Sequence, residues 1–159
     1  MRGAALTPTV QDCRVQKLHT VLDHRGAITV VEGGQDVGFE FRRAYWTYDV
    51  PGGASRAGHA HRRLRQLYVA VAGSFEVLLD DGLEQRVVPL GHPDVGLVIV
   101  PGIWREVRQF SPGACLMVLA SEHYDEGDYI RLHTVFRQWV ACGRPDGAFG
   151  QHSVDLAVR

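Results

Sequence analysis

The sequence predicts an all-β domain, a sandwich or barrel of short strands, with one short helix near its C-terminal end. Segments rich in Val, Ile, Leu and aromatic residues alternate, about every ten residues, with turns that contain glycine. One later segment breaks this pattern because its apolar residues recur at helical spacing. They are Tyr129, Leu132, Val135, Phe136, Trp139 and Val140.

The expected strands follow one another along the chain. They cover residues 27–32, 39–50, 65–72, 74–79, 85–90, 96–100 and 114–121. Asp80, Asp81 and Gly82 predict a hairpin, because aspartate and glycine tolerate the positive φ angles of such turns. Residues 143–159 contain Gly, Pro and polar residues without periodicity. We therefore expect a single domain over residues 1–142 and a flexible tail over residues 143–159.

Composition and charge limit the classes of partner. The chain has 159 residues, with 17 Lys and Arg, 18 Asp and Glu, and a formal charge of -1, so it offers no basic surface for nucleic acid or an anionic membrane. Its three cysteines cannot all pair within one chain. No signal-peptide pattern is present, and no apolar run approaches the roughly 18 residues of a membrane span. We expect a cytoplasmic protein with no nucleic acid or membrane partner.

Two histidines on one predicted strand are the strongest functional signal. Side chains alternate along a strand, so His59 and His61 point to the same face of a sheet. The surrounding spacing is Gly53, five residues, His59, one residue, His61, four residues, Gln66, six residues, Gly73. This spacing resembles the first sequence motif of the cupins, with glutamine where that motif usually has a glutamate ligand. It predicts a cupin jelly roll, also called a double-stranded β-helix.

The residues around this histidine pair argue against a metal site. Cupins that bind a metal usually carry a further histidine on a later strand, but the corresponding residues 101–106 contain none. Gln66 is neutral and Arg105 repels a divalent cation, an effect that Glu106 offsets only in part. A histidine without a metal has a pKa of about 6.5 and exchanges protons at neutral pH. We therefore expect no metal, no other cofactor, and acid/base chemistry by the two histidines.

Several further blocks of sequence occur in an order that is typical of one enzyme family. They are residues 23–26 (DHRG), 39–46 (FEFRRAYW), 56–61 (RAGHAH), 73–82 (GSFEVLLDDG), 104–106 (WRE), 119–121 (LAS) and 124–131 (YDEGDYIR). With these blocks, the chain from Asp23 to about Val140 resembles the nucleotide-sugar 3,4-ketoisomerases. These are metal-free cupins that act on dTDP-4-keto-6-deoxyglucose in deoxysugar biosynthesis. Ordered blocks are more specific than one short motif.

The resemblance implies the identity of the substrate and of the principal site residues. The substrate is a dTDP-linked 4-keto-6-deoxyhexose, and His59 and His61 are the acid/base pair. Tyr45 and Arg43 from the preceding strand, and Arg25 from a D-x-R-G segment, are implied to line the site. Both arginines suit the diphosphate, because guanidinium groups bind phosphate in bidentate fashion. The family also implies a homodimer that exchanges strands between its subunits.

Three more residues complete the expected site. Gln66, together with Tyr45, is expected to donate hydrogen bonds to the oxyanion formed in the reaction, and Arg105 to stabilise the same charge. Trp46 stands where the family commonly has a second tyrosine, so any function of a hydroxyl is lost there. We include Trp46 among the substrate-binding residues. A second departure lies in the family segment R-G-x-H-A-H, which begins Arg-Ala-Gly-His here.

The expected reaction moves a carbonyl group without a redox cofactor. A base removes the hydrogen on C3 of the 4-ketosugar, which leaves an enediol or enediolate, and reprotonation of C4 gives the 3-ketosugar. Three alternatives stay open. One is a metal-dependent cupin, such as an oxygenase, that uses His59, His61, Gln66 and Glu106. The others are a nucleotide-sugar epimerase and a sugar-binding cupin without catalysis. The sequence leaves open which histidine acts on carbon, and whether the product is gluco or galacto.

Overall fold

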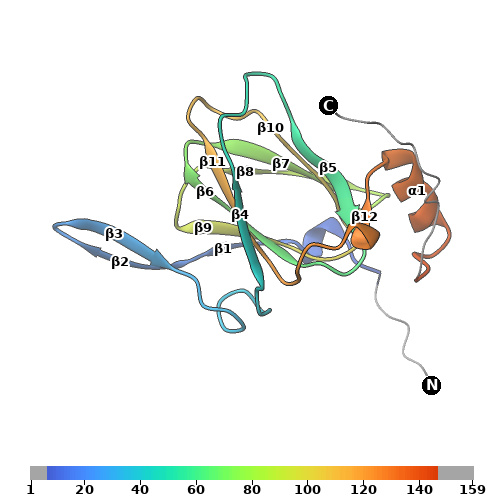
Figure 1. Cartoon of the computed structure of the whole chain (residues 1–159), viewed down its shortest axis with the longest axis horizontal. Helices are drawn as coiled ribbons and strands as arrows, with labels where there is room; N and C mark the ends of the chain where they lie inside the picture. The colour runs from blue at the N-terminus through green and yellow to red at the C-terminus, as the bar shows by residue number, and fades with distance from the viewer. Residues whose placement is uncertain (1–6, 147–159) are drawn as a thin grey trace.

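A computed structural model describes residues 7–146 of the chain. Two five-stranded antiparallel sheets face each other, and one helix lies beside the second sheet (Figure 1). The strand order is β1-β9-β6-β11-β4 in the first sheet and β12-β5-β10-β7-β8 in the second. This arrangement confirms the predicted all-β fold of the jelly-roll type with a short C-terminal helix.

The elements have the following bounds. The first sheet contains β1 (Arg14–Lys17), β9 (Val95–Ile99), β6 (Gln66–Ala72), β11 (Cys115–Ala120) and β4 (Arg43–Thr47). The second contains β12 (Tyr129–Ile130), β5 (Arg56–His61), β10 (Trp104–Arg108), β7 (Phe75–Asp80) and β8 (Gln85–Leu90). A separate hairpin consists of β2 (His19–Asp23) and β3 (Gly26–Val30). Two short 3-10 helices, η1 (Val10–Asp12) and η2 (Glu126–Asp128), and the helix α1 (His133–Ala141) complete the fold.

The predicted strands agree with the observed ones where apolar residues dominate. Residues 81–84 join β7 to β8 where the sequence predicts a hairpin, and Gly82 has a φ of 96° that glycine adopts without strain. The predicted ranges do not include β1, β2, β10 or β12, and β5 is predicted only as the strand that carries His59 and His61. The first two of these strands consist largely of exposed residues, as the polar side chains of Arg14, Lys17 and His19 show, so they lack the apolar signal of a buried strand.

The helix is shorter than the apolar spacing predicts. Tyr129 and Ile130 form β12 and pair with β5, so the helix begins only at His133. The pairing of β12 with a neighbouring strand overrides the local helical pattern. Phe136 and Trp139 of α1 are buried against the second sheet as expected. Within residues 7–146, no helix is long and apolar enough to cross a bilayer.

The main core fills the space between the two sheets. Its buried members are Val10, Cys13, Tyr68, Ala70, Phe75, Val77, Leu79, Val88, Leu90, Leu97, Ile99, Ile103, Val107, Leu116 and Val118. Burial of these side chains supplies most of the free energy that stabilises the fold. It also holds β5, β6 and β10 in fixed relative positions, which matters because these strands carry the polar residues described below.

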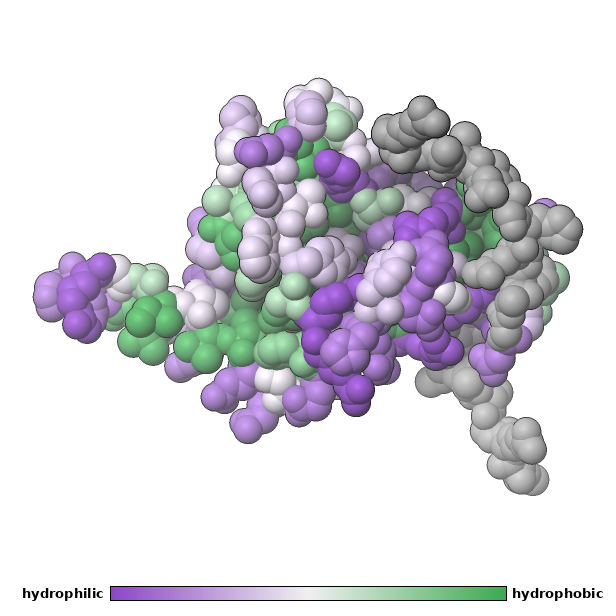
Figure 2. Space-filling view, in the orientation of Figure 1, coloured by the Kyte–Doolittle hydropathy of each residue, from purple (hydrophilic) through white to green (hydrophobic). Residues whose placement is uncertain are grey.

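The β2–β3 hairpin extends from the main body, whereas the residues directly after α1 lie against it. The β2–β3 hairpin projects to one side and exposes Val21, Leu22 and Ile28, and green apolar surface covers part of it in Figure 2. After α1, Arg144 donates hydrogen bonds to the carbonyls of Pro8 and Asp81, at 3.0 and 2.8 Å. The start of the predicted tail therefore contacts the domain. The rest of that tail, residues 147–159, lies outside the described residues, as do residues 1–6.

Candidate active site

Two imidazole rings lie side by side at the end of β5. The ring centroids of His59 and His61 are 4.8 Å apart, with an angle of 79° between the ring planes. His61 is fully buried and His59 is 8% exposed. Tyr129 of β12 packs its ring against both imidazoles, at centroid distances of 5.0 and 4.2 Å. The strand thus brings the two histidines to one side of the sheet, as the H-x-H spacing predicts.

The backbone is irregular immediately before the histidine pair. Ala57 and Gly58 have φ angles of 65° and 70°, and the pairing of β5 with β10 shifts its register at this point. An irregularity of this kind redirects the side chains that follow it, and such bulges are common beside functional sites. Ala57 pays about 1–2 kcal/mol for its left-handed conformation. The strain therefore lies where the chain turns His59 towards the interior.

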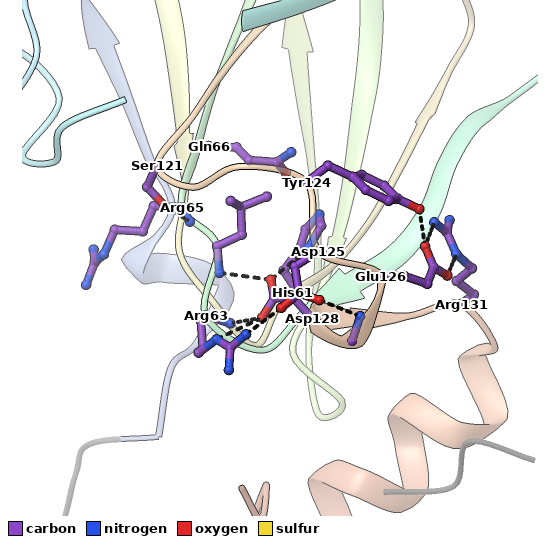
Figure 3. A network of polar contacts seen from close by, with 12 residues as sticks. His61, Arg63, Arg65, Gln66, Ser121, Tyr124, Asp125, Glu126, Asp128 and Arg131 are labelled. Carbon is purple, nitrogen blue, oxygen red and sulfur yellow. Dashed lines mark hydrogen bonds and ion pairs between the residues drawn. The ribbon is translucent and has the colours of Figure 1, made fainter. Parts of the chain in front are cut away.

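A carboxylate holds one of the two imidazoles. Asp128 Oδ2 lies 3.1 Å from His61 Nδ1, and the backbone N–H groups of Arg63 and Leu64 donate to Asp128 at 2.8 and 3.2 Å (Figure 3). Burial raises the pKa of Asp128, but the hydrogen bonds from His61, Leu64 and Arg63 lower it below the usual value overall. Asp128 is therefore ionised at neutral pH. Sequence reasoning gave this residue no role.

A buried arginine lies on the strand next to the histidines. Arg105 of β10 is paired in register with His59 and is 0% exposed. In the described part of the chain, its Nε, Nη1 and Nη2 atoms have no hydrogen-bond partner. A buried charge without a partner is costly, so this guanidinium is a strong attractor for an anion.

The environment keeps both imidazoles neutral. Burial, reinforced by the charge of Arg105, lowers the pKa of His59 to about 2. Burial also lowers the pKa of His61 to about 4, although the hydrogen bond that His61 donates to Asp128 acts in the opposite direction. At neutral pH both rings therefore have a free nitrogen lone pair that can accept a proton. Among residues 7–146, the Nε2 atoms of both rings lack a hydrogen-bond partner.

Polar groups of the first sheet face this cluster. Gln66 Nε2 donates to the hydroxyl of Tyr45 at 2.8 Å, and Gln66 Oε1 is buried without a partner among the described residues. Burial raises the pKa of Tyr45, so the hydroxyl keeps its proton and stays available as a donor. Arg43 stacks on Tyr45 and Tyr124, with its guanidinium carbon 5.3 and 5.6 Å from the ring centroids. Its Nε and Nη2 atoms also have no partner in the described chain.

A cavity of about 380 Å³ opens beside this cluster. It is lined by Arg43, His61, Arg63, Leu64, Glu122, His123, Tyr124, Asp125, Asp128 and Tyr129. The volume lies in the range of small-molecule sites. The cavity therefore gives a ligand access to His61 and to the guanidinium of Arg43 together.

The donor set does not fit a divalent metal. Gln66 is neutral where a carboxylate would match the charge of the ion, and the positive charge of Arg105 lies beside His59. Glu106, the carboxylate of the metal alternative, alternates to the opposite face of β10 from Arg105. In the part of the chain that the structure describes, no three His, Cys, Asp or Glu side chains are grouped to hold a metal ion.

Two of the expected site residues do not reach this cluster within one chain. Arg25 lies at the turn of the projecting hairpin, with a side chain that is 77% exposed and ion-paired with Asp23 (Figure 1). Trp46 follows Tyr45 on β4 but alternates to the outer face, where it is 62% exposed. Conversely, the structure adds Asp128 and Tyr129 to the site. Their proximity depends on the pairing of β12 with β5, which no local sequence pattern indicates.

The chain is similar to known proteins over most of its length. Residues 11–141 match the family model described as "FdtA: WxcM-like, C-terminal". A curated relative from Aneurinibacillus thermoaerophilus, TDP-4-oxo-6-deoxy-alpha-D-glucose-3,4-oxoisomerase, is 38% identical over 128 residues. That match covers 80% of this chain and 92% of the relative.

Solved structures show the same similarity. A 3,4-ketoisomerase from Helicobacter canadensis has 37% sequence identity and a TM-score of 0.80, covering 82% of this chain and 98% of its own. QdtA, a sugar 3,4-ketoisomerase from Thermoanaerobacterium thermosaccharolyticum solved with TDP, has 33% identity and a TM-score of 0.82, covering 85% and 98%. A mutant of QdtA has been solved with TDP-4-keto-6-deoxyglucose, at 34% identity and a TM-score of 0.79, covering 82% and 94%.

Proposed function

The chain belongs to the family of sugar-nucleotide 3,4-ketoisomerases, and we propose that it moves the keto group of dTDP-4-keto-6-deoxyglucose from C4 to C3. It is an isomerase of deoxysugar biosynthesis. One observation of this chain carries the proposed chemistry. Two neutral imidazoles, those of His59 and His61, lie 4.8 Å apart, and on the adjacent strand lies a guanidinium with no hydrogen-bond partner among residues 7–146.

The proposed mechanism is acid/base catalysis by the histidine pair without a metal. One neutral imidazole removes the hydrogen on C3, which the neighbouring carbonyl acidifies, and an enediolate forms across C3 and C4. The other imidazole moves a proton between the two oxygens. Reprotonation of C4 then completes the reaction. Each positioned proton transfer contributes on the order of 10²- to 10⁴-fold to the rate.

Fixed donors stabilise the negative charge of the enediolate in this proposal. Arg105 is buried and its guanidinium nitrogens have no hydrogen-bond partner among residues 7–146, and the Tyr45 hydroxyl and the Gln66 amide lie on the opposing sheet. Donors that are already in place need no reorganisation when the charge develops, which is why such groups accelerate reactions. Arg43, whose Nε and Nη2 atoms are also without partners in residues 7–146, is proposed to bind the diphosphate.

The proposal includes a homodimer with exchanged strands. Its support is the projecting β2–β3 hairpin, which exposes Val21, Leu22 and Ile28. Apolar side chains gathered on an exposed arm are typical of a surface that contacts a protein. In such a dimer the hairpin carries Arg25 to the partner subunit, where it reaches the substrate. The substrate contact of Trp46 stays a prediction. The three cysteines are free, which fits a reducing cytoplasm.

The test is incubation of the enzyme with dTDP-4-keto-6-deoxyglucose in D₂O, followed by NMR of the product. The expected product has its carbonyl at C3 and solvent deuterium at C4. Exchange of a ring hydrogen with the carbonyl still at C4 would instead identify an epimerase. The absence of any turnover would favour a sugar-binding cupin.

A second measurement addresses the metal-dependent alternative. The purified protein is dialysed against a chelator, its metal content is determined, and its turnover is compared with that of untreated protein. We expect unchanged turnover. Loss of activity that a divalent ion restores would overturn the metal-free mechanism.

A further inference from the structure

Asp128 is a buried carboxylate that the proposed reaction has not used. It is 6% exposed and comes from η2, far along the chain from the histidine that it contacts. Two backbone N–H groups fix it, that of Arg63 on Oδ1 and that of Leu64 on Oδ2. Because β12 follows η2 and pairs with β5, the backbone holds this carboxylate against His61.

The contact defines which nitrogen of His61 carries hydrogen. An ionised carboxylate only accepts hydrogen bonds, so the ring nitrogen 3.1 Å from Asp128 Oδ2 must be the donor. That nitrogen is Nδ1, which leaves the lone pair of the neutral ring on Nε2. Within the described chain, Nε2 has no hydrogen-bond partner. It is therefore free to take a proton from a ligand.

We propose that Asp128 is a positioning residue that holds His61 in the Nδ1–H tautomer and so makes Nε2 the proton acceptor of the site. The inference rests on the proposed function, in which His61 exchanges protons with the sugar. Asp128 acts through His61 and takes no proton itself. Its role is to fix the orientation, the tautomer and the basicity of one imidazole.

The charges around His61 give Asp128 a second effect. The groups that face this ring are His59 on its own strand, Arg105 from β10, Arg43 from β4, Tyr129 from β12 and Asp128 itself. Both arginines oppose the positive charge that His61 gains when it takes a proton. Asp128 is the only carboxylate among these five groups, so it alone favours the imidazolium. Without it, the repulsion from the two arginines would oppose proton uptake by His61 more strongly.

The test is the substitution Asp128→Asn, read by kinetics and by NMR of ¹⁵N-labelled histidine. When the amide oxygen of asparagine accepts the N–H of Arg63, the NH₂ group faces His61 and donates to Nδ1, and the N–H of Leu64 loses its acceptor. We expect the tautomer to reverse, so that Nε2 carries hydrogen and no longer accepts a proton. The value of kcat should fall roughly 10²- to 10⁴-fold, while KM changes less than about threefold.

Two further variants separate positioning from folding. Asp80→Asn removes the carboxylate that lies 3.0 Å from Nε2 of another histidine, His133, and neither residue lines the cavity. We expect wild-type kcat from this control even if its stability falls. Asp128→Glu retains a carboxylate near His61 and should keep the Nδ1–H tautomer. Its kcat is expected to lie at least tenfold above that of Asp128→Asn.

The outcomes distinguish this inference from the proposed function. An Nε2–H tautomer in the wild-type protein overturns the inference, whether or not any variant folds. So does a folded Asp128→Asn protein with full turnover. If His61→Asn retains full turnover, the proposed function fails instead, and the tautomer measurement still decides how Asp128 acts on His61.

Discussion

Residues 7–146 contain two contacts between a histidine and a buried aspartate, in two different regions. His61 Nδ1 lies 3.1 Å from Asp128, and His133 Nε2 lies 3.0 Å from Asp80. The side chain of His61 is 0% exposed, whereas that of His133 is 45% exposed. The first pair lines the cavity, and the second attaches α1 to the end of β7 and packs against Trp104.

The two histidine–aspartate pairs differ in how completely their own polar atoms, and those of the side chains next to them, are paired. Around His61, buried polar atoms without a partner belong to His59, Gln66 and Arg105 as well as to His61 itself. Among residues 7–146, no atom of Asp80 or His133 is in this set, although Nε of Arg144, which bonds to the neighbouring Asp81 carbonyl, is in it. Asp80 also accepts from the Gly82 N–H and from Gln85. Folded proteins pair nearly all buried polar groups, so unpaired ones mark a place where a ligand supplies the partner. The same contact therefore has a chemical role in one region and a structural role in the other.

The largest expected effect separates the two histidines. His61→Asn should lower kcat roughly 10²- to 10⁴-fold, because it removes a proton-transfer group. His133→Asn should keep kcat within about twofold of the wild type, because it removes only a contact of α1. Initial rates of product formation by NMR, with thermal unfolding as the control for folding, measure both. Equal losses of turnover would show that the comparison is wrong.

The next largest effect separates two arginines. Arg105→Met should lower kcat roughly 10²- to 10³-fold, because it removes an oxyanion donor. It should also raise the melting temperature of the protein without substrate, because a buried charge without a partner disappears. Arg137 on α1 is the matched control, since it donates to the Gly82 carbonyl at 2.6 Å. Arg137→Met should lower the melting temperature and leave turnover unchanged. A lower melting temperature for Arg105→Met would contradict the interpretation.

The pH dependence of stability should also differ between the two regions. The folded-state pKa values of His59 and His61 are about 2 and about 4, below the ordinary value of 6.5. The unfolded chain therefore binds more protons, so this contribution to stability is complete above about pH 6.5 and is lost as pH falls towards 4. Urea unfolding at pH values between about 7 and 5 should show a decline that the double variant His59→Asn/His61→Asn reduces.

In the second region, Asp80 affects the stability of the protein at lower pH values than the two site histidines do. Burial raises the pKa of Asp80, but hydrogen bonds from Gln85, Gly82 and His133 lower it below 3.8 overall. Its contribution is present above about pH 3.8 and is lost as pH falls below that value. Asp80→Asn should therefore leave the slope between about pH 7 and pH 5 unchanged. A changed slope in that range would contradict the assignment of the decline to the site histidines.

The smallest expected effect concerns backbone strain beside the site. Ala57 has a φ of 65°, a conformation that glycine adopts without the steric cost of a Cβ atom. Ala57→Gly should stabilise the protein by about 1 kcal/mol, or about 3 °C in melting temperature. Turnover should change less than about twofold, because the backbone path to His59 is retained. Differential scanning calorimetry measures the shift, and a lower melting temperature would refute the assignment of strain.

The sequence predicts the site residues that share one strand better than those that are brought in by pairing between strands far apart in the sequence. Alternation along one strand is a local property, so the shared face of His59 and His61 follows from their spacing. The contact of Asp128 with His61 spans 67 residues and requires β12 to pair with β5. Tyr129 illustrates the same limit, because its apolar spacing predicts a helix while strand pairing places it against the histidines.

Arg25 and Trp46, which do not reach the histidine cluster within one chain, differ from the predicted site for another reason. Arg25 and Trp46 were assigned to the site by resemblance to a family that is expected to form dimers. Family resemblance reports on the assembled enzyme, whereas a single chain shows only its own contacts. Arg25 on the projecting hairpin is therefore not expected near the histidines of its own chain (Figure 1).

Because the buried guanidinium of Arg105 has no hydrogen-bond partner among residues 7–146, binding of an anionic ligand at the site should increase the stability of the folded protein. Enzyme molecules with an empty site carry the full desolvation cost of that group, and molecules that hold an anionic ligand recover part of it. The resistance of the protein to heat and to proteases must then rise with the ligand concentration, by RT ln(1 + [L]/Kd) in free energy. In a cell, the lifetime of this enzyme would follow the supply of its own nucleotide sugar.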